Sequence, residues 1–110
     1  MLVVTFTKDS RNRLSSVFAK GHADTADHGE DVVCAAVSAI VQAARLGLQA
    51  YAGVDLEVRQ EAGDFWMRWP EGNRDDEAVR AIVTTAELSI EQIASQYPTH
   101  VRLLRTGEGG

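Results

Sequence analysis

The chain has 110 residues, of which 45% are apolar and 25% charged, and its formal net charge is −5. This length predicts a single domain over residues 1–110, because domains commonly have roughly 100–200 residues. The one cysteine excludes the class of small secreted domains held together by intrachain disulfides. Sixteen acidic against eleven basic residues argue against a protein that binds nucleic-acid phosphates. No apolar run reaches the roughly 18 residues of a membrane-spanning helix, so we expect a cytoplasmic protein without membrane contact.

The first part of the chain predicts a β-hairpin followed by a loop. Residues 1–7 are apolar and β-branched, and residues 14–20 alternate around Val17 and Phe18, so we expect two strands joined by the polar residues 8–13. Residues 21–31, GHADTADHGED, contain no apolar side chain larger than alanine. This composition predicts a loop.

A helix is predicted to begin at Glu30 and Asp31, where acidic side chains favour the positive end of the helix macrodipole. Gly53 is a suitable residue to end it. One buried face is predicted from the helical spacing of Val33, Val37, Ile40, Ala44 and Leu48.

The second part of the chain repeats this pattern. Alternating residues 54–60, a turn at 61–64 and residues 65–69 predict a second hairpin. Residues 70–74 follow as a loop, with Asn73 as the predicted N-cap of a second helix that Pro98 ends. The apolar stripe of that helix is predicted to comprise Val79, Ile82, Val83, Ala86, Ile90, Ile93 and Tyr97. With a last strand at 100–105 and a frayed tail, the order β-β-α-β-β-α-β predicts an α+β domain in which a mixed sheet packs against two helices.

Cys34 is the first candidate for chemistry. It falls within the first turn of the predicted helix, where unpaired backbone N–H groups and the macrodipole lower a thiol pKa from about 8.5. The alternative remains open that a cysteine among valines and alanines is a small core residue.

His22 is the candidate base for this thiol, because a loop that returns to the helix start can bring it near Cys34. His28 is the rival, although a solvated loop residue is the simpler interpretation. Asp31 and Ser38 lie three residues before and four after Cys34, on one helical face. Asp31 would orient His22 or serve only as a helix-start acid, and Ser38 would donate a hydrogen bond or be inert.

Two other interpretations concern the loop and the tryptophans. His22, Asp24, Asp27, His28 and Cys34 are all possible zinc ligands, but their spacing matches no established ligand pattern, so no metal site is predicted. Trp66 and Trp69 should face opposite sides of a strand, which places at most one of them in the core.

The segment GHADTADHGEDVVCAAVSAI, residues 21–40, resembles the signature of the ribosomal-processing cysteine protease family Prp. In that family a Gly-His pair and a short loop precede Gly-x-Asp-Ile-Val-Cys-Ala-Ala-Val-Ser. The matching residues are Gly21, His22, Gly29, Asp31, Val33, Cys34, Ala35, Ala36, Val37 and Ser38. Val32 replaces the usual isoleucine.

The resemblance implies that Cys34 is the nucleophile and His22 the base, with Asp31 and Ser38 in support. It implies a homodimer without cofactor or metal that removes the N-terminal extension of ribosomal large-subunit protein twenty-seven after paired aromatic residues. The segment between His22 and Cys34 would order around the substrate. This predicted substrate loop contains Gly21, Ala23, Asp24, Thr25, Ala26, Asp27, His28 and Gly29. The alternatives are a non-catalytic ribosome-assembly module that binds through this loop and a His/Asp/Cys metal-binding protein.

Overall fold

The computed structural model describes residues 1–21 and 28–108, with the backbone alone for residues 28–31. Five strands and two long helices follow the predicted order. The strands are β1 (Leu2–Lys8), β2 (Leu14–Lys20), β3 (Glu57–Glu61), β4 (Asp64–Arg68) and β5 (Val101–Gly107), and the helices are α1 (His28–Leu46) and α2 (Glu77–Gln96). The predicted α+β class, with one mixed sheet and two helices, is confirmed.

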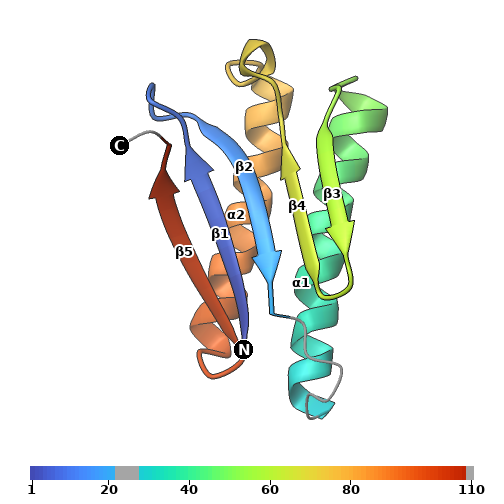
Figure 1. Cartoon of the computed structure of the whole chain (residues 1–110), viewed down its shortest axis with the longest axis vertical. Coiled ribbons are helices and arrows are strands. Elements are labelled where there is room, and N and C mark those ends of the chain that lie inside the picture. Colours follow the sequence, from blue (N-terminus) through green and yellow to red (C-terminus); the bar gives the residue numbers. More distant parts are fainter. Residues whose placement is uncertain (22–27, 109–110) are drawn as a thin grey trace.

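The sheet has the strand order β3-β4-β2-β1-β5, and β1 lies at its second position from one edge (Figure 1). Neighbouring strands are antiparallel except for β1 and β5, which pair in parallel from Leu2 beside Val101 to Lys8 beside Gly107. The first and last strands of the chain are therefore direct neighbours. Their pairing also orders Thr106 and Gly107, which the sequence analysis assigned to the tail.

Both helices cover the same face of the sheet (Figure 1). Alternation in the strands turns Leu2, Val4 and Phe6 of β1 toward these helices, and all three are at most 2% exposed. One continuous core results, which also contains Val17, Val33, Cys34, Val37, Val41, Leu48, Phe65, Met67, Trp69, Val79, Val83, Ile90 and Val101.

Helix α1 begins earlier than predicted, because His28 and Gly29 already belong to it. The sequence predicts a loop at both residues, and this conformation is wrong, while their contact with substrate stays a prediction. Hydrophobic periodicity identifies only the turns that contact a core, and the polar residues before Val32 carry no such pattern. The predicted buried face is confirmed, with Ile40 half-buried at its margin.

The end of the first helix is also different in detail. The α-helix stops at Leu46 and continues as a π-helical segment, Gly47–Tyr51, before Gly53 turns the chain with a φ of +66°. A Cβ atom at Gly47 would lie 3.3 Å from Ile82 Cδ1, so glycine permits the close approach of α2 there.

Two boundaries in the second half were wrong. Strand β3 starts at Glu57 rather than residue 54, because the Val54 N–H donates to Leu48 O at 2.9 Å instead of joining the sheet. The N-cap of α2 is Asp76 rather than Asn73, and its carboxylate accepts from the Ala78 and Val79 amides. Tyr97 follows the last helical residue and is 46% exposed, so it does not extend the apolar stripe.

The predicted absence of any membrane-length apolar segment needs correction. Residues Val32–Tyr51 are long and apolar enough to span a membrane by length and composition, with a mean hydropathy of 1.5. A third of this stretch is buried in the protein. This stretch is apolar for two reasons. It is rich in alanine, and one of its faces packs in the core of the protein.

Candidate active site

Cys34 lies in the second turn of α1 and is only 2% exposed. Because the helix begins at His28, the cysteine is not in the first turn as predicted. The field of the macrodipole falls off within that turn, so it stabilises a thiolate at Cys34 less than the sequence indicates. Cys34 belongs to the same core cluster as Val33 and Val37, which fits the expectation of a small core residue.

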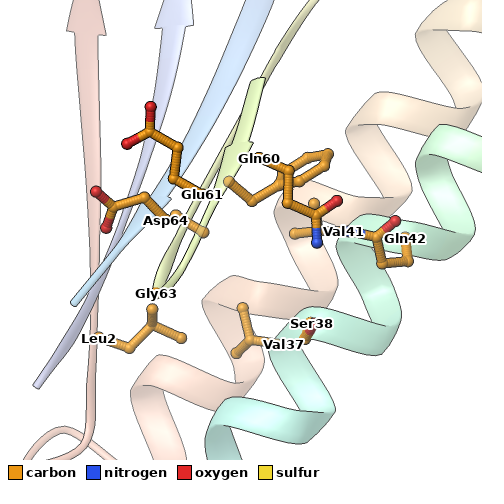
Figure 2. A pocket seen from close by; sticks show the side chains of 11 residues that line it. Leu2, Val37, Ser38, Val41, Gln42, Gln60, Glu61, Gly63 and Asp64 are labelled. Carbon is orange, nitrogen blue, oxygen red and sulfur yellow. The ribbon is translucent and has the colours of Figure 1, made fainter. Parts of the chain in front are cut away.

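The helix holds Ser38 in a different environment. Ser38 is exposed, although it lies one turn after the buried Cys34. It stands at the edge of the surface beside α1, while its neighbour Val37 points inward (Figure 2).

The remaining predicted site residues lie wholly or partly outside the described structure. His22, with loop residues 23–27, is outside the described residues, and only the backbone of Asp31 is described, within α1. The proposed contacts of His22 with Cys34 and of Asp31 with His22 stay predictions. The metal alternative also depends on His22, Asp24 and Asp27. Over the parts of the chain that the structure does describe, no group of three His, Cys, Asp or Glu side chains is placed to hold a metal ion.

Gly21 fixes the point at which the chain leaves β2 toward His22. Its φ is +105°, which side chains rarely permit, and a Cβ atom here would lie 2.5 Å from the carbonyl oxygen of Met1. Both conditions require glycine. The glycine of the Gly-His pair is therefore required by the structure, because the backbone that follows β2 packs closely against the residue before β1.

A cavity of about 150 Å³ opens beside α1 (Figure 2). It lies between the helix, the turn that joins β3 to β4, and the ends of β1 and β2. Its walls include Ser38 and Val37 of α1 together with Leu2, Ala19 and Phe65 from three different strands. The cavity thus begins one helical turn beyond Cys34.

The strand residues of this cavity are not predicted from the sequence. Ala19 and Phe65 are paired neighbours on β2 and β4, and Leu2 lies on the next strand. No local pattern in the sequence marks them as members of one site, because only the register of three strands brings them together.

The two tryptophans take different positions, as predicted. Trp69 is 1% exposed and its indole N–H donates to Leu14 O at 2.7 Å, which makes it a core residue. Trp66 lies on the opposite face of the sheet beneath Arg59, whose guanidinium carbon is 4.9 Å from the ring centroid. Since α1 covers the other face, Trp66 does not line the cavity beside Cys34.

A family model described as Cysteine protease Prp matches residues 1–102 of the chain. This chain belongs to the Prp family of cysteine proteases. The match includes Gly21, His22, Cys34 and Ser38, and it confirms the family indicated by the motif in residues 21–40.

Individual Prp proteins match over almost the whole chain. The ribosomal processing cysteine protease Prp of Bacillus subtilis is 30% identical over 108 residues, which cover 94% of this chain and 96% of that protein. The Staphylococcus aureus protein of the same name is 29% identical over 106 residues, covering 94% and 97%.

The fold is shared with Prp as well. A crystal structure of an essential ribosomal processing protease Prp from S. aureus, in complex with a substrate peptide, matches this structure with a TM-score of 0.86. The match covers 96% of this chain and 99% of that chain at 24% identity. The mixed five-stranded sheet with two helices on one face is therefore the Prp fold.

Proposed function

We propose that this cysteine protease is a site-specific endopeptidase that removes the N-terminal extension of ribosomal large-subunit protein twenty-seven, cutting after paired aromatic residues. The observation that carries the proposal is the Prp family match over residues 1–102, which includes the Gly-His pair and the cysteine of the motif. The net charge of −5 suits an enzyme whose substrate is a basic ribosomal protein rather than ribosomal RNA.

In the proposed mechanism, the Cys34 thiolate attacks the scissile carbonyl carbon and His22 protonates the departing amine. Water, deprotonated by His22, then hydrolyses the resulting thioester and releases the carboxylate product and the thiol. Asp31 orients His22, and Ser38 donates a hydrogen bond to the thiolate or the reacting carbonyl. Because Cys34 is 2% exposed, the bound peptide must displace the atoms that cover the sulfur.

The start of α1 offers donors for the oxyanion. The first four N–H groups of a helix lack intrahelical partners, and α1 begins at His28. Helical side chains lean toward the N-terminus, so the Cys34 side chain leans toward this first turn. Backbone N–H groups in residues 28–30 are therefore the proposed stabilisers of the tetrahedral intermediate.

The decisive experiment incubates the purified protein with the extended ribosomal substrate and follows the products by mass spectrometry. We expect a single cut by the wild type, none by Cys34→Ser, and a loss of about 10²–10⁴-fold in rate for His22→Ala. His28→Ala is the comparison variant, because His28 is the rival base and its side chain has no part in the proposed mechanism, so this variant should keep the activity.

Two results would contradict the assignment. Cleavage by Cys34→Ser would exclude Cys34 as the nucleophile. A rate loss in His28→Ala with none in His22→Ala would show that His28 is the base instead of His22. Tight binding without any cleavage by the wild type would favour the non-catalytic assembly module.

We further propose that the enzyme works in the cytoplasm as a homodimer without a cofactor. Sedimentation or light scattering at micromolar concentration tests the oligomeric state. A monomer that cleaves the substrate at full rate would rule out the dimer as the active form.

A further inference from the structure

One face of the sheet carries large apolar side chains without a helix over them. Both helices pack on the opposite face, and within residues 1–21 and 28–108 no helix covers the face that is turned to the viewer in Figure 1. Strand alternation places Phe18 and Leu104 on this uncovered face, and each is 37% exposed. Trp66 lies on it as well, beneath Arg59. Large apolar side chains gathered on one exposed face are typical of an interaction surface.

The register of the strands aligns these side chains in one row. Trp66 pairs with both Arg59 and Phe18, and Thr5 pairs with both Phe18 and Leu104. This central row therefore crosses all five strands, and its middle residue, Phe18, lies on the middle strand β2. Aromatic side chains are enriched in the centres of protein interfaces, so the central row has the composition of such a centre.

The next row toward the β3–β4 turn is charged. From β3 to β5 its members are Glu61, Asp64, Lys20, Val3 and Arg102. Lys20 and Asp64 are cross-strand neighbours of opposite charge. No ion pair among the described residues includes Glu61 or Arg102. This charged row is thus acidic at the β3 edge of the sheet and basic at the β5 edge.

A second copy of the chain matches this charge pattern. Two sheets that pack face to face lie about 10 Å apart, with strand directions within about 30° of each other. A two-fold axis between them that runs parallel to β2 places Phe18 against Phe18 of the second copy and β3 of each copy against β5 of the other. Glu61 then faces Arg102 of the second copy at both ends of the interface.

The charges also exclude the other face-to-face arrangement. A two-fold axis perpendicular to the strands would place each strand over itself and reverse its direction. Glu61 would then lie over Glu57 of the second copy, because these residues stand two positions to either side of Arg59 on β3. Like charges that face each other across an interface are unfavourable, so the axis parallel to β2 is preferred.

The area of the face suits a weak but specific dimer. Five strands about 4.8 Å apart and five residues long at about 3.4 Å each give a footprint of about 24 Å by about 17 Å. Two such faces bury on the order of 1,000 Å² in total, which is the lower limit for a specific interface. The dimer should therefore dissociate on dilution in the micromolar range.

We propose that the uncovered face of the sheet is a dimer interface and that its occupant is a second copy of this chain. The inference rests on the homodimer of the proposed function and names its surface, with Phe18, Trp66 and Leu104 at the centre. Because α1 packs on the opposite face of the sheet, Cys34 lies away from the interface. Each copy thus keeps its own candidate active site, and the two sites lie on the outer sides of the dimer.

The first test measures the dimer dissociation constant of the purified protein by sedimentation equilibrium between about 1 µM and about 500 µM, the range expected for an interface of this size. Phe18→Glu places two carboxylates against each other at the two-fold axis and should raise the dissociation constant at least about tenfold. Tyr51→Glu is the matched control, since Tyr51 is 82% exposed and lies in the segment Gly47–Tyr51 outside the sheet. It should keep the wild-type dissociation constant.

The second test reverses the charges at the edges. Glu61→Arg and Arg102→Glu each bring like charges together at both ends of the dimer and should raise the dissociation constant about three- to tenfold. The variant with both substitutions restores opposite charges and should return to within about twofold of the wild type. Such a recovery requires contact between copies, because Glu61 and Arg102 lie on opposite edge strands of one sheet.

The results separate this interface from the enzyme. Unchanged dissociation constants in Phe18→Glu and in both single charge reversals, with melting temperatures near that of the wild type, would overturn the interface. A wild type that stays monomeric over the whole range would overturn both the interface and the proposed homodimer. Cleavage of the ribosomal substrate is measured separately, so a dimer that is lost in Phe18→Glu and recovered in the doubly reversed variant supports the interface even if the protease proposal fails.

Discussion

Cys34 and Gly21 show how different two residues of one motif are in physical terms. Cys34 is buried in the core cluster, so a reagent or a substrate reaches its sulfur only after neighbouring atoms move. Gly21 is exposed, and it is constrained by its backbone rather than by packing. The motif therefore combines one position buried in the core with one constrained by chain geometry.

Replacement of Gly21 by alanine should destabilise the protein and impair cleavage. The left-handed φ alone costs about 1–3 kcal/mol in a residue with a side chain, and the new Cβ also overlaps the Met1 carbonyl oxygen. Gly72→Ala is the control, because a Cβ atom there meets nothing within 4 Å and its φ is not left-handed. Thermal unfolding measures both variants, and equal melting temperatures would show that Gly21 is not constrained.

Asp9 couples the stability of the protein to pH, because its carboxyl pKa is lowered in the folded state. Burial by itself would raise the pKa of its carboxyl, but hydrogen bonds from the Arg13 backbone, from the Arg74 and Arg13 side chains and from the Arg11 backbone hold it well below its ordinary value. The Arg74 guanidinium, which is 5% exposed, lies 3.0 Å from this carboxylate. A buried cation thus depends on Asp9 for its counter-charge.

Asp9→Asn should therefore lower the melting temperature at neutral pH. A carboxyl whose pKa is lowered by folding contributes its full stabilisation above its ordinary pKa of about 3.9, and it loses this as the pH falls toward the lower folded value. The difference in melting temperature between wild type and Asp9→Asn should be constant above about pH 5 and shrink below about pH 4. Thermal melts from pH 7 to pH 2 test this, and a difference that is independent of pH would refute it.

At the scale of elements, the ends of the helices are the parts that periodicity predicted least well. For α2, the pattern predicts the correct part of the chain, but the N-cap is Asp76 and not the predicted Asn73. Residues Glu71–Asn73 form a short 3₁₀ turn, and Arg74 then donates two hydrogen bonds to Trp69 O. Helix α2 therefore begins after this turn, at Glu77, with Asp76 as its N-cap.

The two candidate caps can be compared directly. Asp76→Ala removes the acceptor of the Ala78 and Val79 amides and should cost about 1 kcal/mol of stability. Asn73→Ala should cost much less, because no side-chain hydrogen bond caps α2 from that position. Urea unfolding gives both values, and a larger loss for Asn73→Ala would reverse the assignment.

At the scale of the whole molecule, one core joins all five strands to both helices. Ile90 of α2 is completely buried and packs in the same cluster as Leu48 and Val4. Because the described residues share a single core, the protein should unfold in one cooperative transition. A local defect in α2 should then reduce the stability of the sheet equally.

Ile90→Ala tests this cooperativity. We expect a loss of about 2–5 kcal/mol, from lost burial and the cavity left behind. Leu88→Ala, two residues earlier and 52% exposed, should change stability by no more than about 0.5 kcal/mol. Circular dichroism and tryptophan fluorescence should give coincident unfolding curves, and separate midpoints would disprove a single cooperative unit.

Sequence alone determined the order of elements, the buried faces of the two helices and the motif that indicates the family. These features are encoded locally, since the side chains that define a helical face or an alternating strand lie within a few residues of one another. The family signature lies within residues 21–40. Strand alternation also predicted that Trp66 and Trp69 face opposite sides, but only the structure shows that Trp69 is the buried one.

Only the tertiary structure decided the strand order, the contact of Arg74 with Asp9 and the cavity beside α1. Leu2 pairs with Val101, and Arg74 meets a carboxylate 65 residues earlier. The cavity is built from four strands and one helix. Such contacts depend on how the helices and strands pack and on the register in which the strands pair. Local sequence patterns do not determine them, because many arrangements satisfy the same patterns. The free energy of the complete core selects one of them, which is why the candidate nucleophile could be found from its neighbours in sequence and the pocket beside it could not.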